Sequence, residues 1–416
     1  MQNDCAIGNN PKVIVCTPEP RDGAAKYAAE LVIALARAGC NVVLLCPANF
    51  AYSESILQAN GKLVYSPERD VSSASLLRRI LRNLRFMASA ARTQYDVTRP
   101  GDIVHFQNPL HLPLGFIFYR LVRLHGASII LTAHDPLPHR WRFPKFLQGM
   151  ERRMLGWAYQ SADAIVVHNA RGKRVLLDLF HVPRDRVHTI PHGADPDNQR
   201  ESKYPEFDCL RLLAFGGIRE NKGLHYAIEA VQKLRGQLSI PVRLTISGKL
   251  YTAAETQYWK RCMQMIENDP EGIEVSEGFV ADADIPSLFA RHHALILPYT
   301  DFFSESGVAA LAVSHRRPIL ATTAGGLGEM IDQFECGIGI STVDVTGVMA
   351  AIRIAAEAGH ERLRQMGETG ERKLCAARSW NTVAKRTIDL YSHIHHGPGR
   401  TAVSGLDSRP AIGQDR

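Results

Sequence analysis

One segment of this chain combines glycines with two basic residues, a pattern that suits ligand binding. In the run LLAFGGIRENKGLHYAIEAV, Gly216 and Gly217 end an apolar stretch. Arg219 and Lys222 lie in the short loop that follows, and Gly223 precedes a helical pattern. Glycines let a ligand approach the backbone closely, and cations beside a helix N-terminus suit a pyrophosphate. We therefore predict a diphosphate site here; a strand–helix turn with two solvated cations is the alternative.

A second candidate anion site lies in the segment SESGVAALAVS. Its apolar helical run begins directly after Ser304-Glu305-Ser306-Gly307. The first backbone N–H groups of such a helix have no partner within the helix, and serine hydroxyls stand beside them. An ordinary helix N-cap is the alternative interpretation.

Short apolar runs separated by helical patterns must supply the strands that position these segments. Strands that are apolar throughout are typical of parallel sheets covered on both faces. Strand and helix alternate in both halves, which predicts two doubly wound parallel α/β domains. The runs are KVIVCT (12–17), NVVLLC (41–46), DIVHFQ (102–107), ASIILTAH (127–134), ADAIVVHN (162–169) and RVHTIPHG (186–193), then LRLLAFGG (210–217), VRLTISGK (242–249), IEVSEGF (273–279), HALILPY (293–299) and PILATT (318–323).

The polar stretch PDNQRESKYPEFD at 196–208 has two prolines and no periodicity, so it reads as a linker. Ligands bind parallel sheets at the carboxyl ends of the strands, so we expect the site in a cleft between the two domains. The predicted organisation is an N-terminal acceptor-binding domain (1–198), a linker (199–208), a C-terminal nucleotide-sugar-binding domain (209–378), a helix packing back on the N-terminal domain (379–395) and a disordered tail (396–416).

Composition limits the class of protein. Hydrophobic residues make up 45% and charged residues 22% of the 416 residues, which is typical of globular domains and excludes collagen-like chains. The net charge of +7 favours anionic partners. The eight cysteines show no CxxC spacing, which indicates free thiols in a reducing compartment. Since neither a signal peptide nor an apolar run of about 20 residues is visible, we expect a cytoplasmic protein.

An arginine-rich amphipathic stretch, SASLLRRILRNLRFMASAARTQ at 73–94, and a second basic stretch, RWRFPKFLQGMERRMLGW at 140–157, suit an anionic bilayer surface. We expect peripheral association with the inner face of a membrane. An ordinary domain helix with solvated arginines is the alternative. Nucleic acid is not an expected partner, because the chain has no recognised nucleic-acid-binding module.

Seven segments, in order from about residue 12 to about 394, resemble motifs of the family 4 retaining glycosyltransferases, enzymes of the GT-B fold. The resemblance implies two Rossmann-like domains that face each other across a cleft. The segments are IVCTPEPRDGAAKYAAELVIALARAGCNVVLLC, LTAHDPLPH, VVHNARGKRVL, HTIPHG, FGGIRENKG, EGFVADADIPSLFARHHALILPY and SGVAALAVSHRRPILATTAGGLGE.

The resemblance also implies roles for individual residues. His134 follows a strand of the first sheet and matches a residue beside the reacting sugar carbon. The expected catalytic residues are His134, Arg219 and Lys222, and the expected acceptor-side residues are Asp135 and His105. The expected donor-binding residues are Gly23, Gly217, Arg219, Lys222, Glu305, Ser306, Gly307 and Val308.

The chain departs from the family's E-x7-E signature. The two glutamates would fall at positions 303 and 311, where this chain has Phe303 and Leu311. Glu305 is displaced by two residues and is a candidate to replace the first of them. Ribose recognition by a glutamate is therefore an open question, and the sequence does not identify the donor base.

The resemblance implies transfer with retention of anomeric configuration, in which the leaving diphosphate accepts the acceptor's proton. Arg219 and Lys222 would stabilise the charge that develops on it. We expect no cofactor and no metal, because Asp282 and Asp284 are interpreted as helix caps.

The expected co-substrate is a UDP- or GDP-linked sugar. The expected acceptor is a saccharide or a lipid-linked molecule of exopolysaccharide, lipopolysaccharide or glycolipid synthesis. A non-catalytic sugar-nucleotide-binding partner and a GT-B sugar-nucleotide epimerase are the alternatives.

Overall fold

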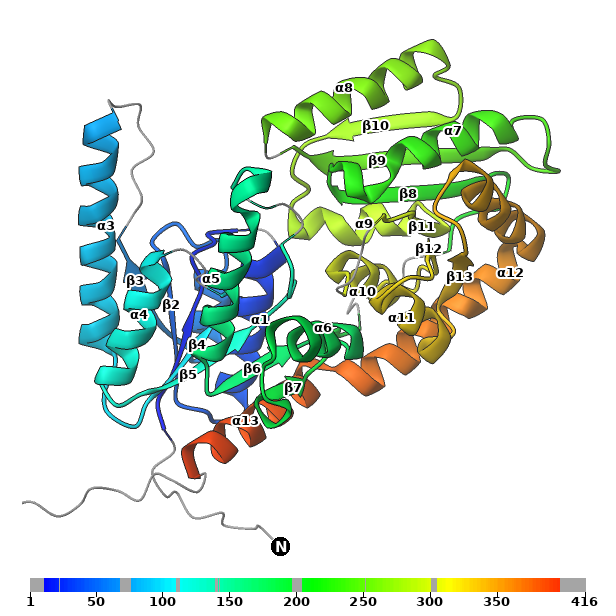
Figure 1. Cartoon of the computed structure of the whole chain (residues 1–416). Coiled ribbons are helices and arrows are strands. Elements are labelled where there is room, and N and C mark those ends of the chain that lie inside the picture. Colours follow the sequence, from blue (N-terminus) through cyan, green and yellow to red (C-terminus); the bar gives the residue numbers. More distant parts are fainter. Residues whose placement is uncertain are drawn as a thin grey trace, which may run out of the picture.

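The computed structural model describes residues 11–21, 23–67, 76–109, 113–138, 141, 143–196, 204–250, 252–300 and 305–396, without the side chains of 76–80, 82, 83, 113, 114, 116 and 117. Two α/β domains lie side by side (Figure 1). The predicted tail beyond His396, residues 199–203 of the predicted linker, Phe303 and Ser304 lie outside the described residues.

The N-terminal domain is built on a parallel sheet with the strand order β3-β2-β1-β4-β5-β6-β7. Its strands are β1 (Val13–Cys16), β2 (Val42–Pro47), β3 (Lys62–Ser66), β4 (Ile103–Phe106), β5 (Ser128–Thr132), β6 (Ala164–Val167) and β7 (Val187–Thr189). Its helices are α1 (Gly23–Arg37), α2 (Ser53–Gln58), α3 (Leu76–Val97), α4 (Pro113–Leu124), η1 (Lys145–Leu147), α5 (Gln148–Gln160), α6 (Ala170–Phe180) and η2 (Arg184–Arg186).

The C-terminal domain repeats this plan with the strand order β10-β9-β8-β11-β12-β13, again parallel. Its strands are β8 (Leu210–Gly217), β9 (Val242–Lys249), β10 (Ile273–Glu277), β11 (Ala294–Leu297), β12 (Ile319–Thr322) and β13 (Gly337–Ile340). Its helices are η3 (Glu220–Lys222), α7 (Leu224–Leu234), α8 (Ala253–Asn268), η4 (Asp282–Asp284), α9 (Ile285–Ala290), α10 (Gly307–Ser314), α11 (Gly326–Phe334) and α12 (Val345–Arg378). The two Rossmann-like sheets confirm the predicted fold class.

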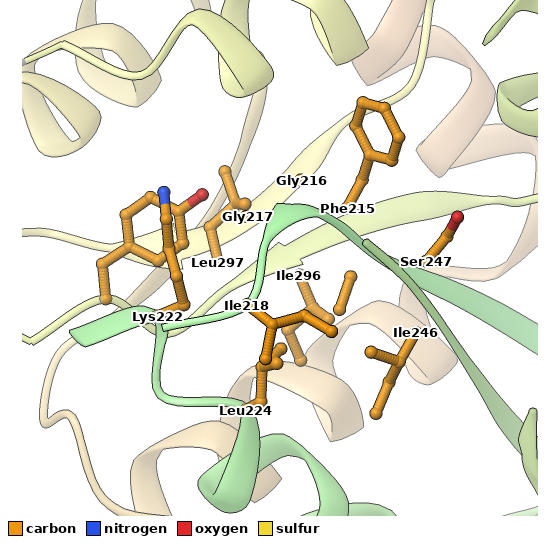
Figure 2. Close-up of a pocket in the computed structure, with 12 residues that line it drawn as sticks. Phe215, Gly216, Gly217, Ile218, Lys222, Leu224, Ile246, Ser247, Ile296 and Leu297 are labelled. Carbon is orange, nitrogen blue, oxygen red and sulfur yellow. The ribbon is translucent and has the colours of Figure 1, made fainter. Parts of the chain in front are cut away.

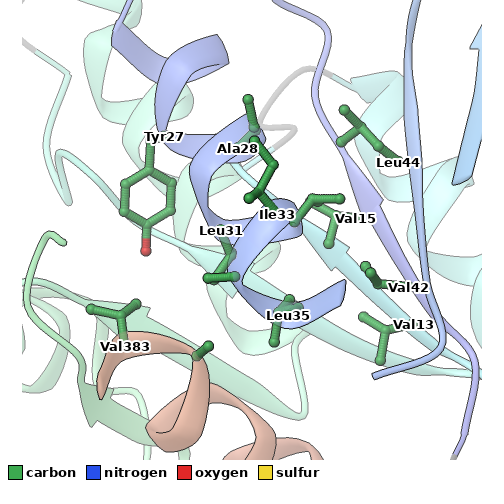
Figure 3. Close-up of a cluster of buried hydrophobic side chains, with 14 of the residues drawn as sticks. Val13, Val15, Tyr27, Ala28, Leu31, Ile33, Leu35, Val42, Leu44 and Val383 are labelled. Carbon is green, nitrogen blue, oxygen red and sulfur yellow. The ribbon is translucent and has the colours of Figure 1, made fainter. Parts of the chain in front are cut away.

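The last helix, α13 (Trp380–His396), leaves the C-terminal domain and packs on the N-terminal one. In Figure 1 this red helix runs below the blue and green elements. Figure 3 shows why α1 accepts it: Ile33 lies toward the strands, whereas Tyr27 and Leu31 lie toward Val383 of α13. Each Å² of apolar surface buried in this contact stabilises the fold by about 25 cal/mol. α13 is therefore part of the N-terminal core.

Parallel pairing places the carboxyl ends of all strands in one domain at one edge of its sheet. β5 ends shortly before His134, and β8 ends at Gly217. His134 and the loop that carries Arg219 and Lys222 thus follow strand ends, where parallel sheets bind ligands.

The described cysteines are free thiols, as predicted, and most are buried. None of the helices in the described part of the chain combines the length and apolarity needed to cross a bilayer.

Candidate functional site

The glycine-rich turn after β8 is shaped by backbone conformation. Gly216 has φ +110° and Gly223 has φ +64°, both in the region that favours glycine. A Cβ at Gly223 would lie 2.0 Å from the Pro298 carbonyl oxygen, so no side chain fits there. The loop between these glycines, which includes η3, is therefore held against the end of β11.

The two predicted cations of this loop differ in their surroundings. The Lys222 ammonium lies 3.7 Å from the centroid of the Tyr299 ring. The Arg219 Nε lies 3.3 Å from Glu255 Oε1, and 43% of the Arg219 side chain is exposed. Figure 2 shows the pocket at this turn, with Gly216 and Gly217 where the chain leaves β8 and Lys222 on the loop that follows. Both cations lie beside the turn, as a diphosphate site requires.

The start of α10 forms the facing wall. The Ser306 hydroxyl caps the helix by accepting a hydrogen bond from the Ala309 N–H at 3.3 Å. A Cβ at Gly216 would lie 3.3 Å from Val308 Cγ2. The glycine-rich turn and the helix N-terminus, 90 positions apart in sequence numbering at Gly216 and Ser306, thus come together.

Glu305, just before α10, is buried and fully engaged by the protein. Its Oε1 accepts a hydrogen bond from Arg378 Nη1 at 2.9 Å, and its Oε2 accepts one from the His192 backbone N–H at 3.1 Å. Burial raises the pKa of Glu305 to about 7, although Arg378 and the His192 N–H oppose that shift. Donor binding by Glu305 stays a prediction; in this structure its carboxylate joins three chain segments.

Aromatic rings connect His134 to the wall formed by α10. The His134 ring centroid lies 4.7 Å from that of Tyr27 and 4.9 Å from that of His168. The His168 and His192 centroids are 5.9 Å apart. A Cβ at Gly307 would lie 3.4 Å from His192 Nε2. The cluster therefore reaches from the carboxyl end of β5 across to the C-terminal domain.

These histidines are neutral at physiological pH. Burial, together with the neighbouring His168, holds the pKa of His134 well below its usual value. Burial likewise lowers the pKa of His168 to about 4 and lowers the pKa of His192. Neutral imidazoles can donate one hydrogen bond and accept one, but they bring no positive charge to the site.

His105 is buried, and both of its ring nitrogens have partners in the protein, so its assignment to the acceptor side stays a prediction. It is 1% exposed within β4. Its Nδ1 lies 2.7 Å from the Tyr391 hydroxyl and its Nε2 lies 2.8 Å from Thr132 Oγ1. With both nitrogens occupied, His105 joins α13 to the first sheet. Asp135 is half-buried beside His134, and Gly23 begins α1; the roles of both remain predictions.

Asp284 occupies the N-cap position of α9, as predicted, whereas Asp282 is the first residue of η4; neither side chain makes a capping hydrogen bond. Asp282 instead forms an ion pair with Lys26 of α1, with Nζ and Oδ2 3.0 Å apart. This pair links the two domains at the surface. Within the described ranges, no group of three or more His, Cys, Asp or Glu side chains could hold a metal ion.

Several residues at the site carried no clear sequence signal. Glu255 approaches Arg219 from the first turn of α8, where it also forms a capping box with Thr252. The pattern Thr-x-x-Glu was readable in the sequence, but its contact with Arg219 was not. His168 and Arg378 reach the site only through the tertiary fold.

Two family models together match most of the chain. The model described as Glycosyltransferase Family 4 matches residues 21–198, and the one described as Glycosyl transferases group 1 matches residues 210–358.

Curated relatives are distant in sequence. The MMP alpha-(1->4)-mannosyltransferase of Mycolicibacterium hassiacum is 27% identical over 328 residues, or 74% of each chain. The mannosylfructose-phosphate synthase of Agrobacterium fabrum is 23% identical over 268 residues, or 60% of this chain and 56% of the relative.

Solved structures share the fold. Anabaena HepE in complex with UDP-glucose aligns with a TM-score of 0.69 at 15% identity over 92% of this chain and 99% of that one. Sucrose-phosphate synthase from Thermosynechococcus elongatus aligns with a TM-score of 0.71 at 16% identity over the same shares. At such identities the alignments show a shared fold and nothing more.

Proposed function

Because the chain is a glycosyltransferase that joins a family 4 N-terminal domain to a group 1 C-terminal domain in a GT-B fold, we propose that it uses a nucleoside-diphosphate sugar as donor and a saccharide or lipid-linked hydroxyl as acceptor. The observation that supports this donor is the position of Arg219 and Lys222 beside the turn after β8. Two cations next to glycine backbone and a helix N-terminus suit a diphosphate.

The proposed chemistry places the diphosphate between the glycine-rich turn and the start of α10. As the glycosidic bond to the diphosphate breaks, Arg219 and Lys222 stabilise the negative charge that grows on the leaving group. The acceptor hydroxyl attacks the same face of the sugar and gives its proton to a leaving-group oxygen. Configuration at the anomeric carbon is then retained. His134 stands on the opposite wall and contacts the transferred sugar.

We further propose that no metal ion is required, since Arg219 and Lys222 provide the charge that a metal would otherwise bring to the diphosphate. Turnover should then be unchanged after dialysis against a chelator. A loss of turnover that added Mg²⁺ or Mn²⁺ restores would overturn this part of the proposal.

A panel of UDP-, GDP- and ADP-linked sugars tests the donor. A ligand that binds only the folded state raises the melting temperature, so the correct donor should stabilise the protein. Release of nucleoside diphosphate should then depend on an added saccharide or lipid-linked acceptor. Release without any acceptor would favour an epimerase-like or hydrolytic reaction, and stabilisation by none of the nucleotides would contradict the proposed donor class.

An anionic membrane is the proposed partner surface. α3 packs beside α4 and α4 beside α5, so the three helices form one layer on the N-terminal domain. Large apolar side chains on this layer are exposed, among them Leu84 (54%) and Trp157 (60%). Arginines accompany them, with Arg85 and Arg153 both exposed. Exposed apolar groups among cations suit an anionic lipid surface, where a lipid-linked acceptor would be found. Arg78, Arg79 and Arg82 of the predicted arginine-rich stretch have side chains outside the described residues.

A further inference from the structure

A chain of two hydrogen bonds runs from a backbone carbonyl to His134. His168 Nδ1 lies 2.9 Å from the Ile190 carbonyl oxygen. His168 Nε2 lies 2.9 Å from His134 Nδ1. His168 is 5% exposed, so water does not compete for these bonds. Three segments of the N-terminal domain are joined in this way: the residues after β5, after β6 and after β7.

The carbonyl of Ile190 determines which ring nitrogens carry a hydrogen in these two hydrogen bonds. A carbonyl oxygen can only accept, so His168 Nδ1 carries a hydrogen. A neutral imidazole carries only one, which leaves His168 Nε2 as an acceptor. His134 Nδ1 must then donate to it, and His134 Nε2 is left with a bare lone pair. A cationic His168 would reverse this order, but burial lowers its pKa to about 4, so it is neutral at physiological pH.

The bare nitrogen is buried and has no partner among the residues that the structure describes. A buried polar atom normally finds a hydrogen-bond partner, so one without a partner calls for an explanation. His134 stands at the carboxyl edge of the first sheet, where ligands of such sheets bind. A group that donates a hydrogen bond, such as a sugar hydroxyl, would satisfy this lone pair; a carboxylate or phosphate oxygen would not.

We propose that His168 is a positioning residue that holds His134 in the tautomer with Nδ1 protonated, so that His134 Nε2 accepts a hydrogen bond from a hydroxyl of the transferred sugar. The identity of that hydrogen-bond donor rests on the proposed function, whereas the tautomer does not. The other tautomer would point an N–H at the same hydroxyl, which then could not donate to it. Loss of His168 should therefore leave the imidazole in place but free to adopt the tautomer that reverses the direction of this hydrogen bond.

Two substitutions of His168 separate its two bonds. In His168→Gln the amide oxygen can reach the Nε2 position and still accept from His134, but the bond to Ile190 is lost. In His168→Asn the shorter side chain can still donate to the Ile190 carbonyl but does not reach His134. A third variant, His168→Leu, removes both bonds at similar volume. We expect His168→Asn and His168→Leu to lose at least about tenfold in kcat with little change in donor dissociation constant, and His168→Gln to retain most activity.

The tautomer itself can be measured by 15N NMR on histidine-labelled protein, because protonated and bare ring nitrogens resonate far apart. Subtracting the spectrum of His134→Ala assigns the signals. Wild type and His168→Gln should show a protonated Nδ1 and a bare Nε2 at His134. His168→Asn and His168→Leu should show the opposite tautomer or a mixture. Each variant's melting temperature is recorded alongside.

A protonated Nε2 at His134 in the wild-type protein would overturn the inference, whatever the variants do. So would kcat values that follow the melting temperatures of the three variants rather than the tautomer. If the tautomer is as expected but no nucleotide sugar is turned over, the proposed function fails and the assignment of protons stands. The two failures are therefore distinguishable.

Discussion

Glu305 Oε1 and Arg378 Nη1 form a hydrogen-bonded ion pair of 2.9 Å in which the two side chains are only 2% and 9% exposed. Because Glu305 precedes α10 and Arg378 ends α12, the pair ties the wall of the candidate site to the junction where α13 departs for the N-terminal domain. The other carboxylate oxygen binds the backbone of His192, between the two domains. A single buried carboxylate thus holds the site and the domain junction together.

The titration of Glu305 should make stability depend on pH. Burial raises its pKa in the folded protein to about 7 from an ordinary 4.5. The folded state then keeps a proton that the unfolded chain releases, so this contribution to the free energy of unfolding is complete below about pH 4.5 and is lost as the pH rises through about 7. Since Glu305→Gln removes the titration, its melting temperature relative to wild type should rise from about pH 5 to about pH 7.5.

Scanning fluorimetry across this pH range measures the difference. Glu229→Gln, on the surface of α7, is the matched control, because its carboxylate is paired with the exposed Lys233. A difference between Glu305→Gln and wild type that stays constant with pH would contradict a raised pKa for Glu305.

Arg219 and Lys222 in the glycine-rich loop should contribute to the affinity for the donor. Arg219→Ala and Lys222→Ala should each weaken binding of the nucleotide sugar by about 1.5–3 kcal/mol, since each removes a charge-assisted contact to phosphate. Isothermal titration calorimetry with the donor or its nucleoside diphosphate measures the loss. Lys233→Ala, which removes an exposed lysine of α7, controls for net charge. Unchanged affinity in both loop variants would exclude this loop from the donor site.

Most of the strands could be predicted from short runs rich in apolar and β-branched residues. β8 and β9 have the predicted bounds, and β10 was predicted although it is half-exposed at the sheet edge. β3 and β13 were missed for opposite reasons: KLVYS lies half-exposed at the sheet edge, and GIGI alternates glycine with isoleucine.

Within the site, local motifs were predictable and their long-range partners were not. The turn after β8 and the Ser306 cap follow from neighbouring residues. The contacts of Glu305 cannot be read from spacing, because Arg378 and His192 lie 73 and 113 positions away from it. The same limit applies to His105, whose partner Tyr391 of α13 lies 286 positions away in the sequence.

The bond between His105 and Tyr391 should contribute to stability rather than to catalysis. Both side chains are buried, and the hydroxyl lies 2.7 Å from His105 Nδ1. Tyr391→Phe leaves that nitrogen unpaired, so the free energy of unfolding should fall by about 1–3 kcal/mol. Chemical denaturation measures the change. Tyr65→Phe, at an exposed position of β3, should have little effect. If Tyr391→Phe instead lowers kcat at full stability, His105 does belong to the active site.

The layer of α3, α4 and α5 should bind anionic vesicles. We expect wild type to co-sediment with phosphatidylglycerol-containing vesicles and to dissociate as salt screens the attraction. Arg85→Gln combined with Arg153→Gln should reduce binding, as should Trp157→Ala, because the first removes charge and the second an exposed apolar group. Arg243→Gln combined with Arg291→Gln, at two exposed positions on the C-terminal domain, is the charge-matched control. No sedimentation of wild type at low salt would contradict the proposed partner surface.

His134 should act in the chemical step. Its ring is packed against Tyr27 and His168, and its unpartnered Nε2 leaves one interaction to be made with a ligand. An interaction that strengthens in the transition state lowers kcat when it is removed and leaves donor affinity nearly intact. His134→Ala should therefore lose at least about tenfold in kcat, equivalent to about 1.4 kcal/mol, with a similar donor dissociation constant. Steady-state kinetics and calorimetry on the same preparation separate the two quantities.

A much lower melting temperature with normal turnover of the folded fraction would make His134 a packing residue of the aromatic cluster. Normal folding, binding and turnover would move the catalytic assignment to Asp135 or Glu305. The pH dependence of kcat in Glu305→Gln would then decide between these two residues.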